Sequence, residues 1–144
     1  MRIIIVLILL AFCGCSKNDI THEDRYSSLP KGCIIEKTQI NFYTKEEVEY
    51  LKEALTKEID IVRISYVEFK LKSNEQSNEK MVIDYAFKNG SNVIDNMTYT
   101  FDEKGQKTFV SALFYRIQYK NGEAVLSEKL KEKLKGKHII NKDQ

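Results

Sequence analysis

Residues 43–59 read YTKEEVEYLKEALTKEI and carry the clearest structural signal in the chain. Thr44 is followed three residues later by Glu47, which is the pattern of a capping box at the start of a helix. Beyond this cap, apolar residues recur at helical spacing while glutamate and lysine fill the other positions. The apolar positions are Val48, Leu51, Leu55 and Ile59. The stretch therefore predicts one amphipathic helix that packs a single face against the rest of the domain.

The residues on both sides of this helix predict strands. Residues 33–43 are rich in isoleucine, threonine and aromatic residues, and from Asp60 onward the apolar residues recur with a period of two. The further predicted strands are 61–72, 81–88, 93–101 and 108–120, with a solvated loop at 73–79. Because the connections are too short for crossover helices, we expect these strands to form an antiparallel meander.

Near the C-terminus, residues 125–134 indicate a short helix, with Ser127 as its cap and Gly136 as its stop. The order of elements predicts an α+β fold: a curled antiparallel sheet of four to five strands, one amphipathic helix packed on it and a short C-terminal helix. This layering resembles the cystatin-like or nuclear-transport-factor-like class of architecture. Folds of that kind carry many unrelated functions, so the resemblance implies no particular activity.

The chain begins with one positive charge at Arg2 and an unbroken apolar run of ten residues, 3–12. As a helix, this run rises only about 15 Å, roughly half the hydrocarbon thickness of a bilayer. A short charged start followed by such a run is typical of a secretory signal peptide rather than of a membrane span. A plain secretory signal and a buried N-terminal helix are the alternatives. A plain signal would not need a cysteine here, and a buried helix would show polar residues at helical spacing, which residues 3–12 lack.

Cys15 follows Gly14 and has Phe12 three positions before it. This pattern resembles the lipobox of bacterial lipoproteins. The resemblance implies cleavage after Gly14 and a diacylglycerol on Cys15, which becomes the mature N-terminus. Cys13 fits the pattern less well, because Phe12 stands where a small residue is needed. Where the host has two membranes, Ser16 after the cysteine implies the outer membrane, with the domain facing the periplasm.

The resulting domain plan has a signal peptide at 1–14, a lipidated polar tether at 15–32, a single domain at 33–136 and a tail at 137–144. The tether contains the only proline of the chain and shows no apolar period. As a flexible coil it would span about 20–25 Å. We therefore expect a cell-envelope protein whose domain is held at a membrane by lipid.

Cys33 is the one thiol that the mature chain keeps besides Cys15. We expect it to act as a small buried hydrophobe, and a mixed disulfide with a partner is the alternative. With Cys15 lipidated, no intramolecular disulfide is possible. Processing at Cys13 would instead allow Cys15 and Cys33 to pair in an oxidising compartment.

The sequence does not favour catalysis. It contains no metal-ligand spacing, phosphate-binding glycine run or nucleophile motif, so we expect no enzyme, no metal and no cofactor. His22 lies in the predicted tether and His138 in the predicted tail, where a general base would be poorly held. Asp95 shares a predicted strand face with Val93 and Met97, where its pKa could be raised, but we expect it to meet water near the strand end.

Tyrosine and charge content bear on partners. The chain has 23 basic and 21 acidic residues, so no strong field favours nucleic acid. Several tyrosines lie on predicted strands, where an exposed group of them would form an interaction surface, although sheets also favour tyrosine for its packing. These tyrosines are Tyr66, Tyr85, Tyr99, Tyr115 and Tyr119.

Two functions remain open from the sequence, with a hydrolase that uses an unrecognised carboxylate site as a third. The first is a lipid-anchored, non-enzymatic binding or accessory factor that contacts another envelope protein or an incoming protein, as an assembly subunit or an immunity or exclusion factor. The alternative is a lipoprotein that binds a small ligand in an apolar pocket between helix and sheet. An exposed aromatic patch would favour the first, and a deep pocket the second.

Overall fold

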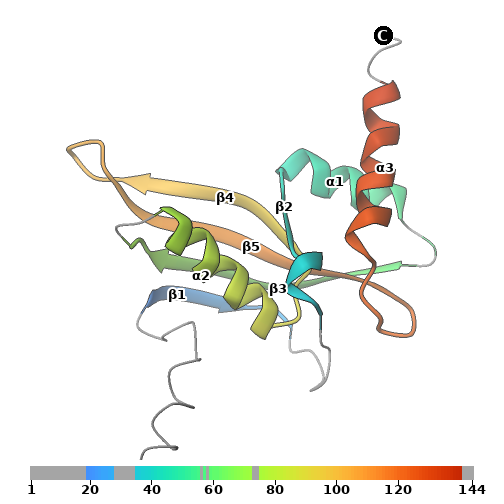
Figure 1. The fold of residues 1–144 in the computed structure, drawn as a ribbon, viewed down its shortest axis with the longest axis horizontal. Helices are drawn as coiled ribbons and strands as arrows, with labels where there is room; N and C mark the ends of the chain where they lie inside the picture. The colour runs from blue at the N-terminus through green and yellow to red at the C-terminus, as the bar shows by residue number, and fades with distance from the viewer. Residues whose placement is uncertain (1–18, 28–34, 56, 58, 73–74, 141–144) are drawn as a thin grey trace, which may run out of the picture.

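The computed structural model describes residues 19–27, 35–55, 57, 59–72 and 75–140. In this part of the chain, five strands form one open sheet and three α-helices pack against it (Figure 1). The α+β class predicted from the sequence is thus confirmed. The strands are β1 (Ile20–Arg25), β2 (Asn41–Tyr43), β3 (Ile59–Lys70), β4 (Val93–Phe101) and β5 (Lys107–Tyr119). The α-helices are α1 (Lys45–Ala54), α2 (Glu75–Lys88) and α3 (Ser127–Ile140).

The strands lie in the order β1-β3-β5-β4-β2, which places the last strand of the sequence at the centre. β5 is antiparallel to both β3 and β4, and β1 is antiparallel to β3. β2 instead runs parallel to β4. β3 and β4 therefore point the same way with β5 between them, and α2 is the crossover that joins them. The all-antiparallel meander without crossover helices is wrong in these two respects.

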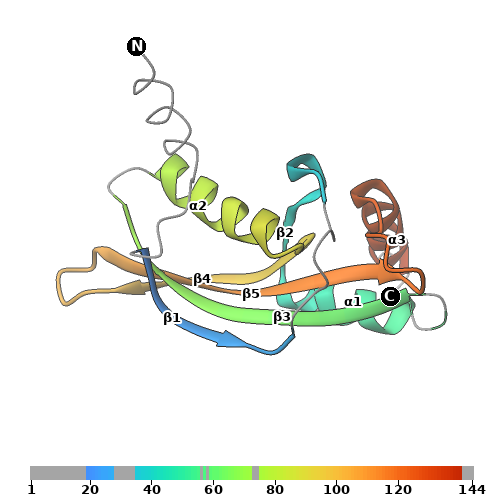
Figure 2. The same cartoon turned by 90° about the horizontal axis from the view of Figure 1, so that it is seen from below.

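The two faces of the sheet are covered by different helices. Successive residues of a strand point to opposite faces, and along β5 this alternation assigns Val110, Ala112 and Phe114 to one buried cluster and Tyr115 and Ile117 to another. The first cluster packs against α2, and the second against α1 and α3. Figure 2 shows α2 on one side of the strands and α1 on the other.

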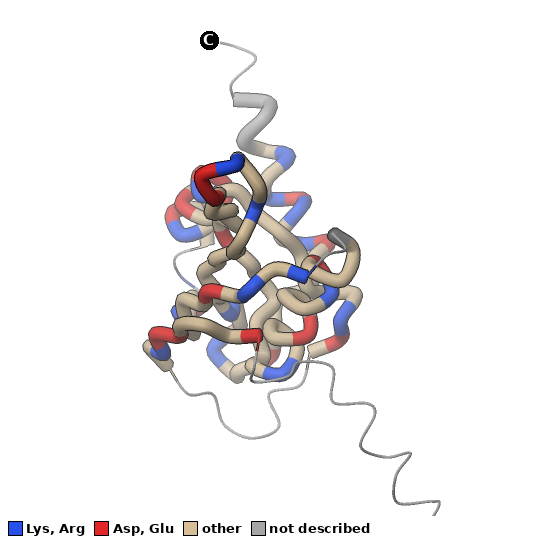
Figure 3. Tube along the Cα trace, turned by 90° about the vertical axis from the view of Figure 1, so that its left-hand side faces the viewer, with Lys and Arg blue, Asp and Glu red and all other residues tan. Residues whose placement is uncertain are grey.

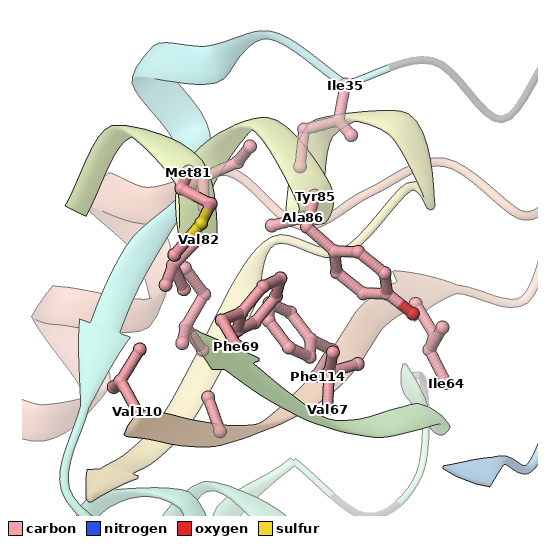
Figure 4. Packing of buried hydrophobic residues seen from close by; sticks show 13 residues of the cluster. Ile35, Ile64, Val67, Phe69, Met81, Val82, Tyr85, Ala86, Val110 and Phe114 are labelled. Carbon is pink, nitrogen blue, oxygen red and sulfur yellow. The ribbon is translucent and has the colours of Figure 1, made fainter. Parts of the chain in front are cut away.

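We call these the α2 cluster and the α1–α3 cluster. The α2 cluster consists of Ile35, Ile40, Ile64, Val67, Phe69, Met81, Val82, Tyr85, Ala86, Ile94, Val110, Ala112 and Phe114 (Figure 4). The α1–α3 cluster consists of Tyr43, Val48, Leu51, Leu55, Ile59, Val93, Tyr115, Ile117, Val125, Leu130 and Leu134.

The stretch predicted as a loop and a strand, 73–88, contains the helix α2, so that prediction is wrong. Residues 81, 83, 85 and 87 are apolar or aromatic and suggested alternation, yet the helix buries Met81, Val82, Tyr85 and Ala86 and leaves Phe87 39% exposed. The spacing of the buried residues is that of a helix face. Val82 and Ala86, which the strand prediction placed on the outer face, are completely buried.

The predicted strand at 33–43 is also largely wrong. Within the described part of this stretch, residues 35–43, only Asn41–Tyr43 forms a strand, and it is preceded by a 3₁₀ turn at Lys37–Gln39. Cys33 lies outside the described residues, as do the neighbouring residues back to 28.

The predicted flexible tether contains the edge strand β1. Its side chains are almost all exposed, so the sequence carried no apolar alternation to reveal it. Two contacts fix β1 to the opposite layer: the Tyr85 hydroxyl donates to the Glu23 carboxylate, and Arg25 Nη2 donates to Asn89 Oδ1 at 2.9 Å. The sheet therefore begins at Ile20, ahead of the domain boundary that the sequence suggested.

The predicted amphipathic helix is confirmed as α1, with its cap, but it ends at Ala54, and Ile59, which was assigned to its apolar face, begins β3. The Glu47 amide donates to Thr44 Oγ1 at 3.2 Å, and the Thr44 amide donates to Glu47 Oε2 at 2.9 Å, which completes the capping box. Ser127, the residue predicted to cap the C-terminal helix, is the first residue of α3, and the helix continues through Gly136, its predicted stop, to Ile140. A glycine inside a helix costs only about 1 kcal/mol, which the buried Leu130 and Leu134 offset. Residues 137–140 are therefore helical and not part of a tail.

Candidate functional site

An open cleft of about 590 Å³ lies where β2 leads into α1. One wall comes from α2 and another from β4, so four elements meet there. The lining residues are Phe42, Tyr43, Thr44, Lys45, Glu46, Glu47, Glu79, Asn96 and Met97.

The cleft combines apolar side chains with an excess of carboxylates. Phe42 is 37% exposed, and Met97 is partly buried against the α2 cluster. Of the charged lining residues, three are glutamates and one is Lys45. Such a surface is chemically suited to a segment that presents an apolar side chain beside a basic one.

A local irregularity in β4 shapes the cleft wall. Asn96 has a φ of 50°, a left-handed conformation that asparagine tolerates better than most residues. The register of β4 against β5 shifts between Asp95 and Thr98. As a result, Met97 and Tyr99 pack against the α2 cluster, whereas Val93 belongs to the α1–α3 cluster. The sequence analysis placed Val93, Asp95 and Met97 on one strand face, and this prediction is wrong for Met97, which follows the irregularity.

Asp95 is buried, contrary to the expectation that it meets water. It is only 3% exposed, pairs with Tyr43 across the parallel strands β2 and β4, and its Oδ1 has no hydrogen-bond partner among the described residues. Burial raises the pKa of Asp95, and the nearby ammonium of Lys52 opposes this. The turn that follows α2 was expected to leave this carboxylate near a strand end in water, but α1 lies over it.

Tyr43, the strand neighbour of Asp95, is also buried with an unsatisfied group. Its hydroxyl has no hydrogen-bond partner in the described part of the chain. Burial raises the pKa of Tyr43 to about 12, and the carboxylates of Glu47 and Glu128 add to this effect. The two residues therefore place two uncompensated polar atoms close to the start of α1.

The two histidines lie apart from the cleft. His22 is on β1, with Nε2 3.1 Å from Asp24 Oδ2 and its ring edge-on to Tyr66 at 6.3 Å between centroids. The side chains of His22 and Asp24 are each more than half exposed. His138 lies in α3 rather than in a tail.

The five tyrosines singled out in the sequence do not form one exposed surface. Tyr85 is 3% exposed in the α2 cluster and Tyr115 is 6% exposed in the α1–α3 cluster. Tyr99 packs partly buried against the first cluster and Tyr119 against the second. Tyr66 is half-buried beside His22. A shared tyrosine patch is therefore not present at these positions.

The described residues contain neither a metal-ligand cluster nor a membrane-spanning helix. No group of three or more histidine, cysteine, aspartate or glutamate residues there is arranged to hold a metal ion. None of the helices in the same part of the chain is both long and apolar enough to cross a bilayer. The predicted signal peptide and Cys15 lie outside the described residues.

Comparison with known proteins gave no relative. No protein-family model, no curated protein and no solved structure matches the chain.

Sequence reasoning missed the cleft because its walls come from contacts between distant segments. Phe42 and Glu79 were assigned to a strand and to a loop, and neither assignment brings them together. The one usable signal was the capping box, since it fixes where α1 begins and so where Phe42 and Glu46 emerge.

Proposed function

We propose that the chain is a lipid-anchored envelope protein that acts as a non-enzymatic binding or accessory factor for another protein. The sequence pattern around Cys15 supports the anchor. The location that follows is the cell envelope, and in a host with two membranes the outer membrane facing the periplasm. An assembly subunit and an immunity or exclusion factor both fit this description.

The observation that carries the binding role is the cleft at the start of α1. It exposes Phe42 beside Glu46 and Glu79, so it offers an apolar contact and two carboxylates in one open concavity. Aromatic anchors surrounded by polar rims are typical of protein–protein contacts. We therefore assign to the partner a segment with an apolar side chain next to a lysine or arginine.

The alternative of a small ligand between helix and sheet has less support. The space between α2 and the sheet is occupied by aromatic rings, with centroids 5.6 Å apart for Phe69 and Tyr85 and 4.6 Å apart for Tyr85 and Phe114 (Figure 4). A ligand there would have to displace side chains that are almost completely buried.

The finer fold assignment also stays a proposal. A sheet with a helix laid across it supports cystatin-like or nuclear-transport-factor-like layering. The parallel pair β2–β4 and the crossover through α2 depart from the antiparallel meander on which that likeness was based.

Photo-crosslinking in the native host tests the binding role. A photoreactive phenylalanine analogue replaces Phe42 in one variant and Phe87 in a control, since Phe87 has a similar exposure of 39% but lies on α2. We expect a discrete covalent adduct with one protein from position 42 only. The double charge reversal Glu46→Lys with Glu79→Lys should abolish that adduct.

The intact mass of the purified protein tests the anchor separately. Native protein should carry acyl chains, and Cys15→Ser should lack them.

Equal crosslinking from positions 42 and 87, or no adduct from either, would contradict the proposed binding site. An unlipidated mature chain would contradict the envelope anchor.

A further inference from the structure

One end of the sheet brings together three segments. There the start of β1 pairs with the end of β3, at Ile20 and Phe69, and the end of β3 pairs with the start of β5, at Lys70 and Phe109. The hairpin that joins β4 to β5 closes the same end. Figure 3 looks onto this end, which is on the left in Figure 1.

The proposed lipid anchor lies very close to this end in the sequence. Only four peptide links separate Cys15 from Asp19, and four residues span at most about 14 Å even when fully extended. Asp19 is itself held to the end of the sheet, because its Oδ2 lies 3.3 Å from Lys72 Nζ. The proposed lipid-bearing residue, Cys15, therefore lies within about 14 Å of Asp19 at this end of the sheet, which is less than the 20–25 Å expected of a flexible tether.

The exposed side chains at this end suit a lipid surface. Phe101 is 56% exposed and is the last residue of β4, where the strand leads into the β4–β5 hairpin. Around it lie the exposed lysines Lys70, Lys72, Lys104 and Lys107. Amphipathic lysine stems and aromatic rings are favoured at the boundary between headgroups and acyl chains, and each lysine near anionic lipid contributes about 1 kcal/mol.

Acidic residues at the same end are partly engaged elsewhere. Asp19 pairs with Lys72, and Asp102 Oδ1 accepts the backbone amides of Lys104 and Gln106 at 2.8 and 2.9 Å. Asp102 is thereby directed into the hairpin turn. Glu103 is also exposed in this hairpin, so the four lysines stand beside the three carboxylates of Asp19, Asp102 and Glu103 and the charge of this end is weakly positive. Lys72 contacts Asp19, and Lys107 Nζ lies 4.2 Å from the centroid of the Tyr99 ring.

We infer that this end of the sheet, with Phe101 at the β4–β5 hairpin, docks on the bilayer that holds the lipidated Cys15. The inference rests on the proposed lipid anchor. Phe101 enters the headgroup region while the lysines contact anionic headgroups. The opposite end of the sheet, about 40 Å away along β5, then points away from the membrane and carries the start of α3.

Tryptophan fluorescence of the lipidated protein tests this orientation, since the natural chain contains no tryptophan. Phe101→Trp reports on the docked end. Leu126→Trp is the matched control, because Leu126 is 58% exposed and lies at the opposite end, next to α3. Each protein is reconstituted into vesicles of phosphatidylethanolamine and phosphatidylglycerol that contain lipid brominated high on the acyl chain.

We expect the bromolipid to quench most of the emission of Phe101→Trp and to leave that of Leu126→Trp nearly unchanged. Replacing phosphatidylglycerol with phosphatidylcholine should weaken the quenching, because the lysines lose their anionic partners. Equal quenching of both variants, stronger quenching of Leu126→Trp, or no quenching of either in vesicle-bound protein would overturn the inference. The intact mass of the same samples separates these outcomes from failure of the anchor itself, which would remove the basis of both proposals.

Discussion

Asp95 shows how a single buried group sets a pH dependence. Because burial raises the pKa of Asp95 in the folded chain above its unfolded value, its contribution to stability is fully present below the unfolded pKa of about 3.9 and is lost as the pH rises through the folded pKa. At neutral pH the folded protein therefore holds a carboxylate that is better solvated in the unfolded chain.

We predict that Asp95→Asn stabilises the protein at pH 7 by about 1 kcal/mol, since it removes the buried charge while keeping the shape. The difference in the free energy of unfolding should shrink to near zero below about pH 4, where the native Asp95 is protonated too. Urea titrations at both pH values measure this. A variant that is less stable than the native protein at pH 7 would show that Asp95 gains a favourable partner in the folded state.

We expect the two buried tyrosines, Tyr85 and Tyr43, to respond differently when each is replaced by phenylalanine. Tyr85→Phe removes a hydroxyl that lies 2.9 Å from Ser65 Oγ and donates to Glu23, so we expect a loss of about 1–3 kcal/mol. Tyr43→Phe removes a hydroxyl without a partner among the described residues, so we expect a change near zero or a slight gain. Urea midpoints of the two variants give the comparison. Equal losses would mean that the Tyr43 hydroxyl is satisfied in solution.

At the scale of single residues, the sequence predicts which residues share a strand face better than it predicts what covers that face. It places Asp95 on an apolar face with Val93, which the structure supports. It does not predict that α1 covers the carboxylate, because that contact joins segments about forty residues apart. Nor does it predict the irregularity at Asn96, since a left-handed residue within a strand leaves no periodic signal.

Among the elements, α1 was predicted with its cap while α2 was predicted as a strand, and the contrast has a physical basis. α1 has a capping box and a wide polar face, which only a helix explains. In α2 the residues from 81 to 87 are nearly all apolar, so a period of two and a period of 3.6 fit equally well. Its burial on the sheet decides the outcome, and that is a tertiary effect.

The edge strand β1 gives an element-scale prediction. Glu23→Ala removes the acceptor of the Tyr85 hydroxyl and the carboxylate that lies 2.9 Å from Arg25 Nη2. We expect the amides of β1 to exchange with solvent several-fold faster, because β1 opens locally from β3. Hydrogen-exchange mass spectrometry resolves this.

The amides of β5 serve as the internal control for Glu23→Ala, since this strand is central and has no contact with Glu23 in the ladder. Their exchange should not change. Faster exchange throughout the sheet would instead indicate global destabilisation and would contradict a local role for the Glu23 contact.

At the scale of the whole molecule, the sheet separates two clusters that share β5. Because this strand contributes to both, the two halves should lose their structure together. We predict that Phe114→Ala in the α2 cluster costs about 3–5 kcal/mol and that Leu130→Ala in the α1–α3 cluster costs about 2–5 kcal/mol. Both variants should unfold in one transition.

Urea unfolding followed by far-ultraviolet circular dichroism and by tyrosine fluorescence tests this cooperativity. Coincident midpoints in each variant are the expected result. If either variant shows two separated transitions, the clusters are independent folding units and the single-domain description fails.

The strand order could not be predicted from the sequence, because it depends on tertiary packing. Period and turn signals identified β3, β4 and β5 as strands, with bounds within about two residues of the structure. Neighbours in the sequence were assumed to be neighbours in the sheet. Instead β5 separates β3 from β4, and only the packing of α2 across both explains that arrangement.

The central position of β5 also constrains when the chain can fold. β1 with β3 and β2 with β4 form two separate pairs, and residues 107–119 are the strand that joins them. A growing chain that ends before Lys107 therefore lacks the middle of its own sheet. We therefore expect such a chain to stay unfolded and protease-sensitive until residues 107–119 have been made.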